Sequence, residues 1–395
     1  MKRDRWLLPD GIEEMLPPAA RHAERVRRAL LDLLDGWGYE LIMPPLVEYL
    51  ESLLTGVGEE LDLKTFKLTD QLTGRMMGVR ADMTPQAARI DAHYLRREEP
   101  VRLCYMGPVL RTRPDEFGGA REPLQIGAEL FGQAGSRADG EVLRLMLAVL
   151  ERAGCRDLHV DIGHVGVFHA LTRAAGIDKT GEGELSQALH RKAKPEIDAL
   201  LDGWTLAPAQ RDSLRALADL HGPLEELPAA MARLQAAGEL VRAAIGDLAA
   251  VGQRLAQRHP HVRWHFDLAE LNGYSYYTGI VFAAYTPGYG QAVAQGGRYD
   301  EIGRAFGRSR PAVGFSADLR VLLRLQGHPD PAVKAIFAPW GDDDGLLAAI
   351  RGLRERGERV IEALQGDPGE AARMGCDRML TERDGQWTVT VMKGH

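Results

Sequence analysis

Hydrophobic residues near the start of the chain recur at helical spacing. Leu30 and Leu34 fall on one face of a helix expected over Ala19–Trp37, and basic residues cover its other face. Short apolar segments bounded by Gly and Pro follow, and this pattern is typical of strands. The expected strands span residues 40–43, 64–69, 75–80, 102–113, 123–131 and 158–162. A helix is expected to open before the last strand, where Ser136 and Asp139 resemble a capping box.

The middle of the chain has a different pattern. From Val165 to Leu255, Ala, Leu, Glu and Arg recur at helical spacing, and Pro195, Pro208 and Pro223 divide the region into short helices. Strand patterns then return at residues 262–268, 274–285, 291–294 and 311–315. We therefore expect a core formed by residues 1–164 and 258–327, interrupted by an all-helical insertion at residues 165–257.

A second boundary is expected near Gly327, which opens a Gly-His-Pro-Asp-Pro run. Beyond it, an apolar strand at Lys334–Ala338, a helix at Leu346–Arg356 and two further strands predict a small α/β appendage at residues 328–395. A domain of this size has little core of its own.

Composition narrows the class of protein. A length of 395 residues favours two or three domains, and a net charge of −7 disfavours extensive contact with tRNA or DNA. Three cysteines without a CxxC pair argue against disulfides and structural zinc, and suit the cytoplasm. Pro9 interrupts the N-terminus before an apolar stretch forms, so we expect no signal peptide, and no apolar run has the length of a membrane span.

Simple catalytic and cofactor motifs do not occur in the sequence. It has no GxxxxGK[ST], GxGxxG, HExxH or GxSxG segment in a suitable context. His259, His261 and His265 are close in sequence, but alternation along one strand accounts for them. We therefore expect no cofactor and no metal.

Four groups of short segments stand in a fixed order along the chain. They are Leu8–Gly11 with Met43–Pro45, Arg80–Pro85, Tyr105–Arg111 with Leu124–Glu129, and Leu271–Gly279 with Gln295–Asp300. Together they resemble the motifs of the histidyl-tRNA synthetase catalytic domain, up to about residue 325. The resemblance implies an α+β fold of the class II aminoacyl-tRNA synthetase type: an antiparallel sheet flanked by helices, here with a helical insertion and a small C-terminal α/β appendage. It also implies a dimer interface near the first segment.

The resemblance implies a pocket for free histidine. Asp82, Thr84 and Gln125 fall where the family holds the ammonium and carboxylate groups of the amino acid. Glu129 and Tyr277 fall where the family contacts the imidazole nitrogens of histidine. These residue types suit the ligand, because charge-assisted hydrogen bonds are roughly twice as strong as neutral ones and a buried carboxylate favours a protonated imidazole.

Two more residues complete the predicted ligand-binding set. Tyr276 is expected to pack beside the pocket, and Arg111 is what remains of the family's phosphate clamp. Ordinary structural roles also account for single members of the set. Asp82 could cap a turn, Glu129 could pair with an arginine, and the tyrosines could fill the core.

The groups that the family uses for amino-acid activation have been replaced. Asn272 stands in place of a signature arginine, and the family's Arg-x-Glu in motif 2 reads Arg111-Thr-Arg113 here. In motif 3, Val321 occupies the position of an arginine, with Arg320 one residue early. Losing one donor that stabilises a transition state costs on the order of 10²–10³ in rate. We expect no adenylation, unless Arg121 or Arg298 compensates. The short appendage, with acidic Asp342–Asp344, also differs from an anticodon-binding domain.

This sequence keeps the residues of an amino-acid pocket and lacks the residues that activate the amino acid. In this combination it is similar to the regulatory-subunit family of ATP phosphoribosyltransferase. That resemblance implies a partner, the short-form catalytic subunit, and a homodimer of this chain within a hetero-octamer. It implies feedback inhibition by histidine in the first step of histidine biosynthesis, and no binding of tRNA. The alternatives are a divergent synthetase that still activates histidine, a binding module for another amino acid or partner, and a purely structural role. The sequence leaves open whether the insertion or the dimer rim contacts the catalytic subunit.

Overall fold

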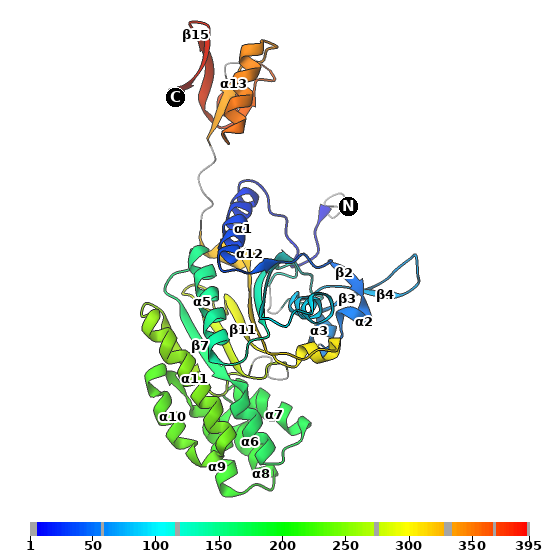
Figure 1. Cartoon of the computed structure of the whole chain (residues 1–395), viewed down its shortest axis with the longest axis vertical. Helices are drawn as coiled ribbons and strands as arrows, with labels where there is room; N and C mark the ends of the chain where they lie inside the picture. Colours follow the sequence, from blue (N-terminus) through cyan, green and yellow to red (C-terminus); the bar gives the residue numbers. More distant parts are fainter. Residues whose placement is uncertain are drawn as a thin grey trace. The chain divides into compact units, whose positions relative to one another are not determined.

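The computed structural model describes residues 6–56, 59–114, 119–271, 276–327, 334–365 and 369–392. The chain divides into two compact units (Figure 1). The first contains Met1–Met15 and Ala23–Gly327, and the second contains Leu16–His22 and His328–His395. No helix in the described ranges is both long and apolar enough to cross a membrane.

A nine-stranded sheet forms the centre of the first unit. In spatial order its strands are β1 (Glu40–Leu41), β5 (Val101–Pro108), β6 (Leu124–Phe131), β12 (Ala312–Asp318), β11 (Ala294–Arg298), β10 (Ile280–Tyr285), β7 (His159–His164), β9 (Arg263–Asp267) and β8 (His221–Pro223). Neighbours are antiparallel except for β1 with β5 and β7 with β9. The expected α+β class, with a largely antiparallel sheet flanked by helices, is confirmed.

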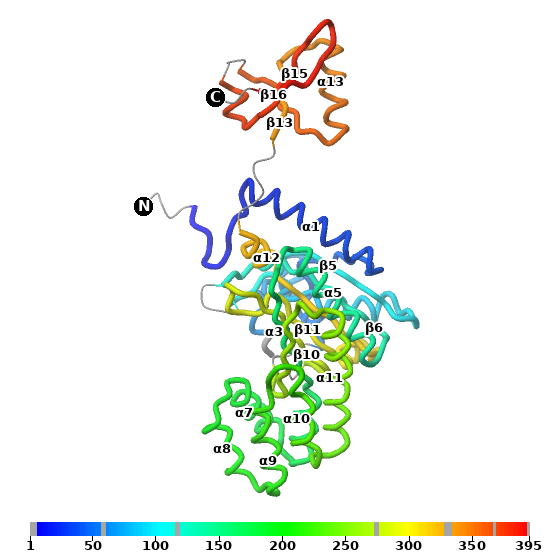
Figure 2. The backbone as a smooth tube through the Cα atoms, turned by 90° about the vertical axis from the view of Figure 1, so that its left-hand side faces the viewer, coloured from blue at the N-terminus to red at the C-terminus, as the bar shows by residue number. Residues whose placement is uncertain are grey.

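Two long helices, α5 (Ser136–Arg152) and α11 (Glu239–Arg258), lie side by side against this sheet (Figure 1; Figure 2). Both bury an apolar stripe in the main hydrophobic core. The prediction of a capping box at Ser136 and Asp139 is wrong. The N-cap of α5 is Gly135, which makes no side-chain cap hydrogen bond, and the carboxylate of Asp139 pairs with Arg298 instead.

The region between β7 and β9 is built mainly from helices. They are α6 (Val165–Ala174), α7 (Lys179–His190), α8 (Lys194–Gly203), α9 (Pro208–Ala216), α10 (Leu227–Arg233) and α11. Pro195 and Pro208 lie in the first turns of α8 and α9, where the missing N–H costs nothing. The expectation that this region holds helices alone is wrong at β8, which adds an edge strand to the central sheet. A three-residue His-Gly-Pro strand has no apolar pattern, so only its pairing with β9 reveals it.

Other elements frame the sheet. The N-terminal helix α1 spans Ala19–Gly36, close to the expected range. A small sheet has the order β2 (Val47–Tyr49), β4 (Met76–Val79), β3 (Phe66–Thr69), and short helices α2 (Leu50–Leu53) and α3 (Glu59–Lys64) adjoin it in the chain. Helix α4 (Thr84–Arg89) continues as a π-helical turn over Ile90–Leu95, and α12 (Leu319–Leu325) follows β12.

The second unit has a separate four-stranded sheet. Its order is β14 (Val360–Glu362), β13 (Ala335–Ala338), β15 (Cys376–Arg383) and β16 (Gln386–Val391), with helices α13 (Asp344–Glu355) and α14 (Glu370–Arg373). Two buried clusters of its own hold it together, one around Ile336 and one around Phe337. The acidic run has a local role, because Asp343 caps α13 and accepts a hydrogen bond from the amide of Leu346 at 2.7 Å.

Candidate functional site

Asp82 contacts both Thr84 and Gln125 where the turn after β4 meets strand β6. The side-chain amide of Gln125 donates to Asp82 Oδ1 at 2.8 Å, and its carbonyl oxygen accepts from the backbone N–H of Met83 at 3.0 Å. The backbone N–H of Thr84 donates to the same Asp82 oxygen at 2.9 Å. Asp82 therefore accepts the backbone N–H of the first residue of α4 and also joins the polar group expected to hold an amino-acid backbone.

Glu129 lies on β6 with only 1% of its surface exposed. The hydroxyl of Tyr105 donates to its Oε1 at 2.8 Å, and the hydroxyl of Tyr299 donates to Oε2. Burial raises the pKa of Glu129 to about 8, although the two tyrosine hydroxyls oppose the shift. Tyr105 also exchanges a hydrogen bond with Thr84 at 3.0 Å, so Glu129 and Asp82 belong to one continuous polar network.

Two glycines make room for this network within the sheet. Gly127 lies opposite Tyr105 in the β5–β6 pair, and a Cβ at Gly127 would come within 2.4 Å of the Tyr105 ring. Gly314 lies opposite Glu129 in the β12–β6 pair, and a Cβ there would lie 1.4 Å from Glu129 Oε2. Any larger residue at either position would displace the buried side chain.

Tyr276 and Tyr277 line the same region. The ring of Tyr276 stacks on Tyr299, with centroids 5.2 Å apart, and meets Tyr277 edge-on at 5.3 Å. The hydroxyl of Tyr276 is buried and has no hydrogen-bond partner among the residues that the structure describes. Tyr277 packs against Gly297, where a Cβ would come within 2.8 Å of its ring. Asn272 lies outside the described residues.

Arg111 lies beside this cluster. Its Nε donates to the backbone oxygen of Ala81 at 3.3 Å, and its own backbone oxygen accepts from Arg121 Nε at 3.1 Å. Burial raises the pKa of Asp318 on β12, and the positive charge of Arg111 partly offsets that shift. The structure thus places six of the seven predicted residues on one connected group of side chains, with Arg111 at its edge.

The arginines nearest to the motif positions expected to serve activation make other contacts. Arg320 donates to the backbone oxygen of Glu13 at 3.2 Å and to Glu122 Oε2 at 3.3 Å. Val321 packs against the main core, and Arg113 is exposed. Arg121 donates to the backbone of Arg111 and packs over the ring of Phe66.

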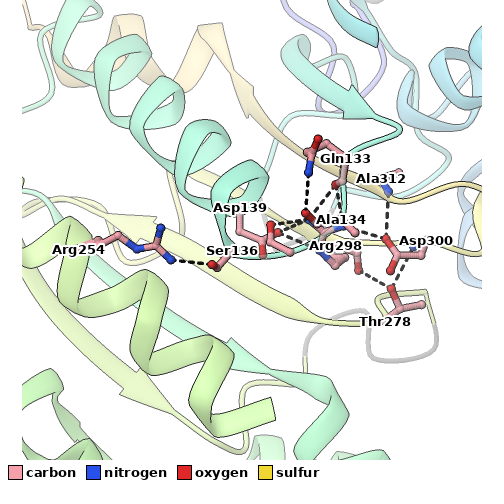
Figure 3. A network of polar contacts seen from close by, with 10 residues as sticks. Gln133, Ala134, Ser136, Asp139, Arg254, Thr278, Arg298, Asp300 and Ala312 are labelled. Carbon is pink, nitrogen blue, oxygen red and sulfur yellow. Dashed lines mark hydrogen bonds and ion pairs between the residues drawn. The ribbon is translucent and has the colours of Figure 1, made fainter. Parts of the chain in front are cut away.

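Arg298 is enclosed by two carboxylates (Figure 3). Its guanidinium donates to Asp139 Oδ1 through Nε and Nη2, at 2.9 and 2.7 Å, and to Asp300 Oδ1 through Nη1 at 3.1 Å. Burial raises the pKa of Asp139 to about 6, against the effect of Arg298. The backbone oxygen of Arg298 accepts from Thr278 N at 2.7 Å, which fixes the segment after Tyr277 to β11. Arg298 therefore has a positioning role here.

Sequence reasoning missed two members of the cluster, Tyr105 and Tyr299. Both lie inside motif segments quoted above, so the signal was present. Their part in holding Glu129 depends on which strands pair across the sheet, and local patterns do not give that order.

Comparison with known proteins identifies the family and the fold. The histidyl-tRNA synthetase family model matches residues 11–322, and the model of the ATP phosphoribosyltransferase subunit HisZ C-terminal domain matches residues 333–390. Among solved structures, an ATP phosphoribosyltransferase regulatory subunit/histidyl-tRNA synthetase from Bacillus halodurans C is 29% identical, with a TM-score of 0.80 over 93% of this chain and 96% of that one. Histidyl-tRNA synthetase from Nostoc sp. PCC 7120, at 20% identity and a TM-score of 0.78, shares the fold over 98% of this chain and 97% of its own.

Curated relatives match along nearly the whole chain. ATP phosphoribosyltransferase regulatory subunits from Alkalilimnicola ehrlichii and Thioalkalivibrio sulfidiphilus are 56% and 55% identical, each over 98% of both chains. The same description applies to a relative from Azotobacter vinelandii at 53% identity. The chain belongs to the family of ATP phosphoribosyltransferase regulatory subunits.

Proposed function

We propose that this chain binds free histidine in the cluster around Asp82 and Glu129 and passes that signal to an ATP phosphoribosyltransferase catalytic subunit. As a member of the regulatory family, the chain is a regulatory subunit and not the catalytic one. The proposal adds a short-form catalytic partner, a hetero-octamer built on dimers of this chain, feedback inhibition by histidine and no role for tRNA. It also places the chain in the cytoplasm, in keeping with three unpaired, buried cysteines.

The observation that carries the proposal is the continuous network from Gln125 through Asp82 and Thr84 to Glu129. Histidine has an ammonium group that needs a carboxylate and neutral acceptors, and Asp82 with Thr84 offers them. Its imidazole needs a carboxyl group in the ring plane, and Glu129 offers one. Burial makes the ionised form of Glu129 costly, so a ligand that brings positive charge offsets that cost.

The surroundings of the network fit sensing better than activation. Adenylation places negative charge on the α-phosphate, and preorganised cations must face it. Arg298 and Arg320 are instead paired with carboxylates of the chain itself, Asp139 and Glu122. For regulation, histidine needs only to favour one state of the complex, by about 1–3 kcal/mol.

Reconstitution with a short-form catalytic subunit tests the proposal. We expect the wild-type chain to stimulate phosphoribosyl transfer and histidine to suppress it. Asp82→Asn and Glu129→Gln should keep the stimulation and lose the histidine effect, whereas Arg254→Met, a change away from the cluster, should keep both. Wild-type mixtures that show neither stimulation nor inhibition would overturn the proposal.

The competing synthetase function has its own assay. Exchange of pyrophosphate into ATP, driven by histidine, requires adenylate formation. We expect no exchange above background with the purified chain. Exchange at the rate of a working synthetase would favour the divergent-enzyme alternative.

A further inference from the structure

We propose that His159, Asp161 and His265 form a binding site for a divalent transition-metal ion, with Zn²⁺ as the natural probe. The site lies on the central sheet, away from the network around Glu129. His159 and Asp161 are two residues apart on β7, so their side chains share one face of the sheet. His265 lies directly opposite Asp161 on the neighbouring parallel strand β9.

The three potential ligand atoms already converge. His159 Nε2 lies 2.9 Å from Asp161 Oδ1, and His265 Nδ1 lies 3.4 Å from the same oxygen. All three atoms lie within 4.8 Å of one another. Adjacent strands of a nine-stranded sheet hold them, so binding requires little rearrangement of the backbone.

One ring nitrogen in this group is unsatisfied. His265 Nδ1 is buried and has no hydrogen-bond partner among the described residues, although the His265 side chain as a whole is 26% exposed. Buried polar atoms normally have a partner, and exceptions often mark an ion or water.

The donor set selects the kind of ion. Two imidazoles and one carboxylate suit Zn²⁺ and its first-row neighbours, whereas Ca²⁺ and Mg²⁺ prefer oxygen alone. Three protein ligands leave a fourth position for water or another donor. The ring of His221 on β8 lies next in line, with its centroid 5.8 Å from that of His265.

The position of the site suggests what the ion does. β7 leads directly into α6, and β8 belongs to the helical region between β7 and β9. An ion held by β7 and β9 would fasten the two strands that enter and leave this region. A ligand that binds only the folded state stabilises it in proportion to the logarithm of its concentration over Kd.

A second group in the chain provides a matched control. Glu151, His259 and His261 also bring three potential ligand atoms within 4.8 Å. Their side chains are more open, with His261 62% and Glu151 44% exposed, and they lie at the ends of α5 and α11 instead of on paired strands. We expect the sheet site to bind more tightly, because its ligands are more rigidly held.

The test uses the full chain, freed of metal by a chelator. Calorimetric titration with Zn²⁺ should show one tight site in the wild type. The double variant His159→Gln/His265→Gln should bind about 100-fold or more weakly, while His259→Gln/His261→Gln stays close to the wild type. Co²⁺ added in place of Zn²⁺ should give a visible absorption band that the first variant lacks.

Two results would overturn the site. One is a wild-type chain without a tight Zn²⁺ site, and the other is loss of binding in the His259/His261 variant with retention in the His159/His265 variant. Circular dichroism of each variant separates loss of a ligand from loss of fold. Should the double variant unfold, the single substitution Asp161→Asn replaces it, with the Co²⁺ band as the readout. Loss of the band in a folded Asp161→Asn chain supports the site, and an unchanged band overturns it.

Discussion

At the scale of single residues, the absence of a side chain at Gly314 and Gly127 matters as much as the polar groups nearby. Glu129 and Tyr105 fill the space that a Cβ would need at these positions. The strand register makes room for both buried side chains, because Gly314 lies directly opposite Glu129 and Gly127 lies directly opposite Tyr105. Such positions tolerate no enlargement without movement of the network.

Gly314→Ala tests this dependence. The new methyl group would overlap Glu129 Oε2, so we expect a loss of roughly 1–3 kcal/mol in the free energy of unfolding and loss of histidine binding. Chemical denaturation and calorimetric titration measure the two effects. Gly140→Ala is the control, since it lies in α5 with open space around it and should stabilise the chain by about 0.5–1 kcal/mol. Equal behaviour of the two variants would refute the steric argument.

The raised pKa of Glu129 predicts a pH dependence. Its value of about 8 in the folded chain exceeds the ordinary 4.5, so the folded state holds this proton more tightly than the unfolded state does. The stability from Glu129 is complete below pH 4.5 and is lost as the pH rises through about 8. As the pH rises from 5 to 8, the wild type should lose a few kcal/mol of stability, whereas Glu129→Gln should not show this loss. The stability of the variant relative to the wild type should therefore increase across this range. Urea denaturation across this range checks the sign, and a constant difference between the two proteins contradicts it.

At the scale of elements, one ion pair joins α5 to β11. Asp139 lies in the first turn of α5, and Arg298 closes β11. Both side chains are less than a tenth exposed. Through Asp300 and Thr278 the same network reaches the segment that carries Tyr276 (Figure 3). Hydrogen bonds and ion pairs thus connect the helix, the strand and the segment that carries Tyr276 and Tyr277.

Arg298→Met should break this link. Removing one partner of a buried pair leaves an uncompensated carboxylate, so we expect a loss of about 3–5 kcal/mol in the free energy of unfolding. Denaturation in urea measures the loss. Arg254→Met removes two exposed hydrogen bonds, one to Ser136 and one to the backbone oxygen of Ala250, and should change stability by less than about 0.5 kcal/mol. Comparable losses in both variants would show that the Arg298–Asp139 pair contributes no more to the free energy of unfolding than the exposed contacts of Arg254.

The scale of elements also shows where sequence patterns succeed. The 18-residue helix α1 was predicted to within a residue at its C-terminal end, because a long amphipathic repeat needs no tertiary information. Strand β8 and the role of Asp139 escaped prediction, because a partner distant in sequence defines each of them. In the same way, motif resemblance predicted Asp82 and Glu129 as site residues, whereas the tyrosine contacts of Glu129 depend on the strand order.

At the scale of the whole molecule, each of the two units has its own buried core. Domains with separate cores unfold as separate cooperative units. The chain should therefore show two calorimetric transitions. Ile336→Ala, in the second unit, should cost roughly 2–5 kcal/mol and lower one transition only, while Leu147→Ala, in the first, should lower the other. A single transition that shifts in both variants would contradict this independence.

The central sheet ends in very short strands on both sides. β1 has two residues, β8 has three, and β8 closes with Pro223, which lacks the N–H that a further strand would need. An incoming chain therefore finds almost no template for backbone pairing at either margin. Fibre-like growth by strand addition is blocked along this sheet. At the margins of this sheet, copies of the chain can associate only through side-chain surfaces, and such contacts favour closed assemblies over open-ended strand addition.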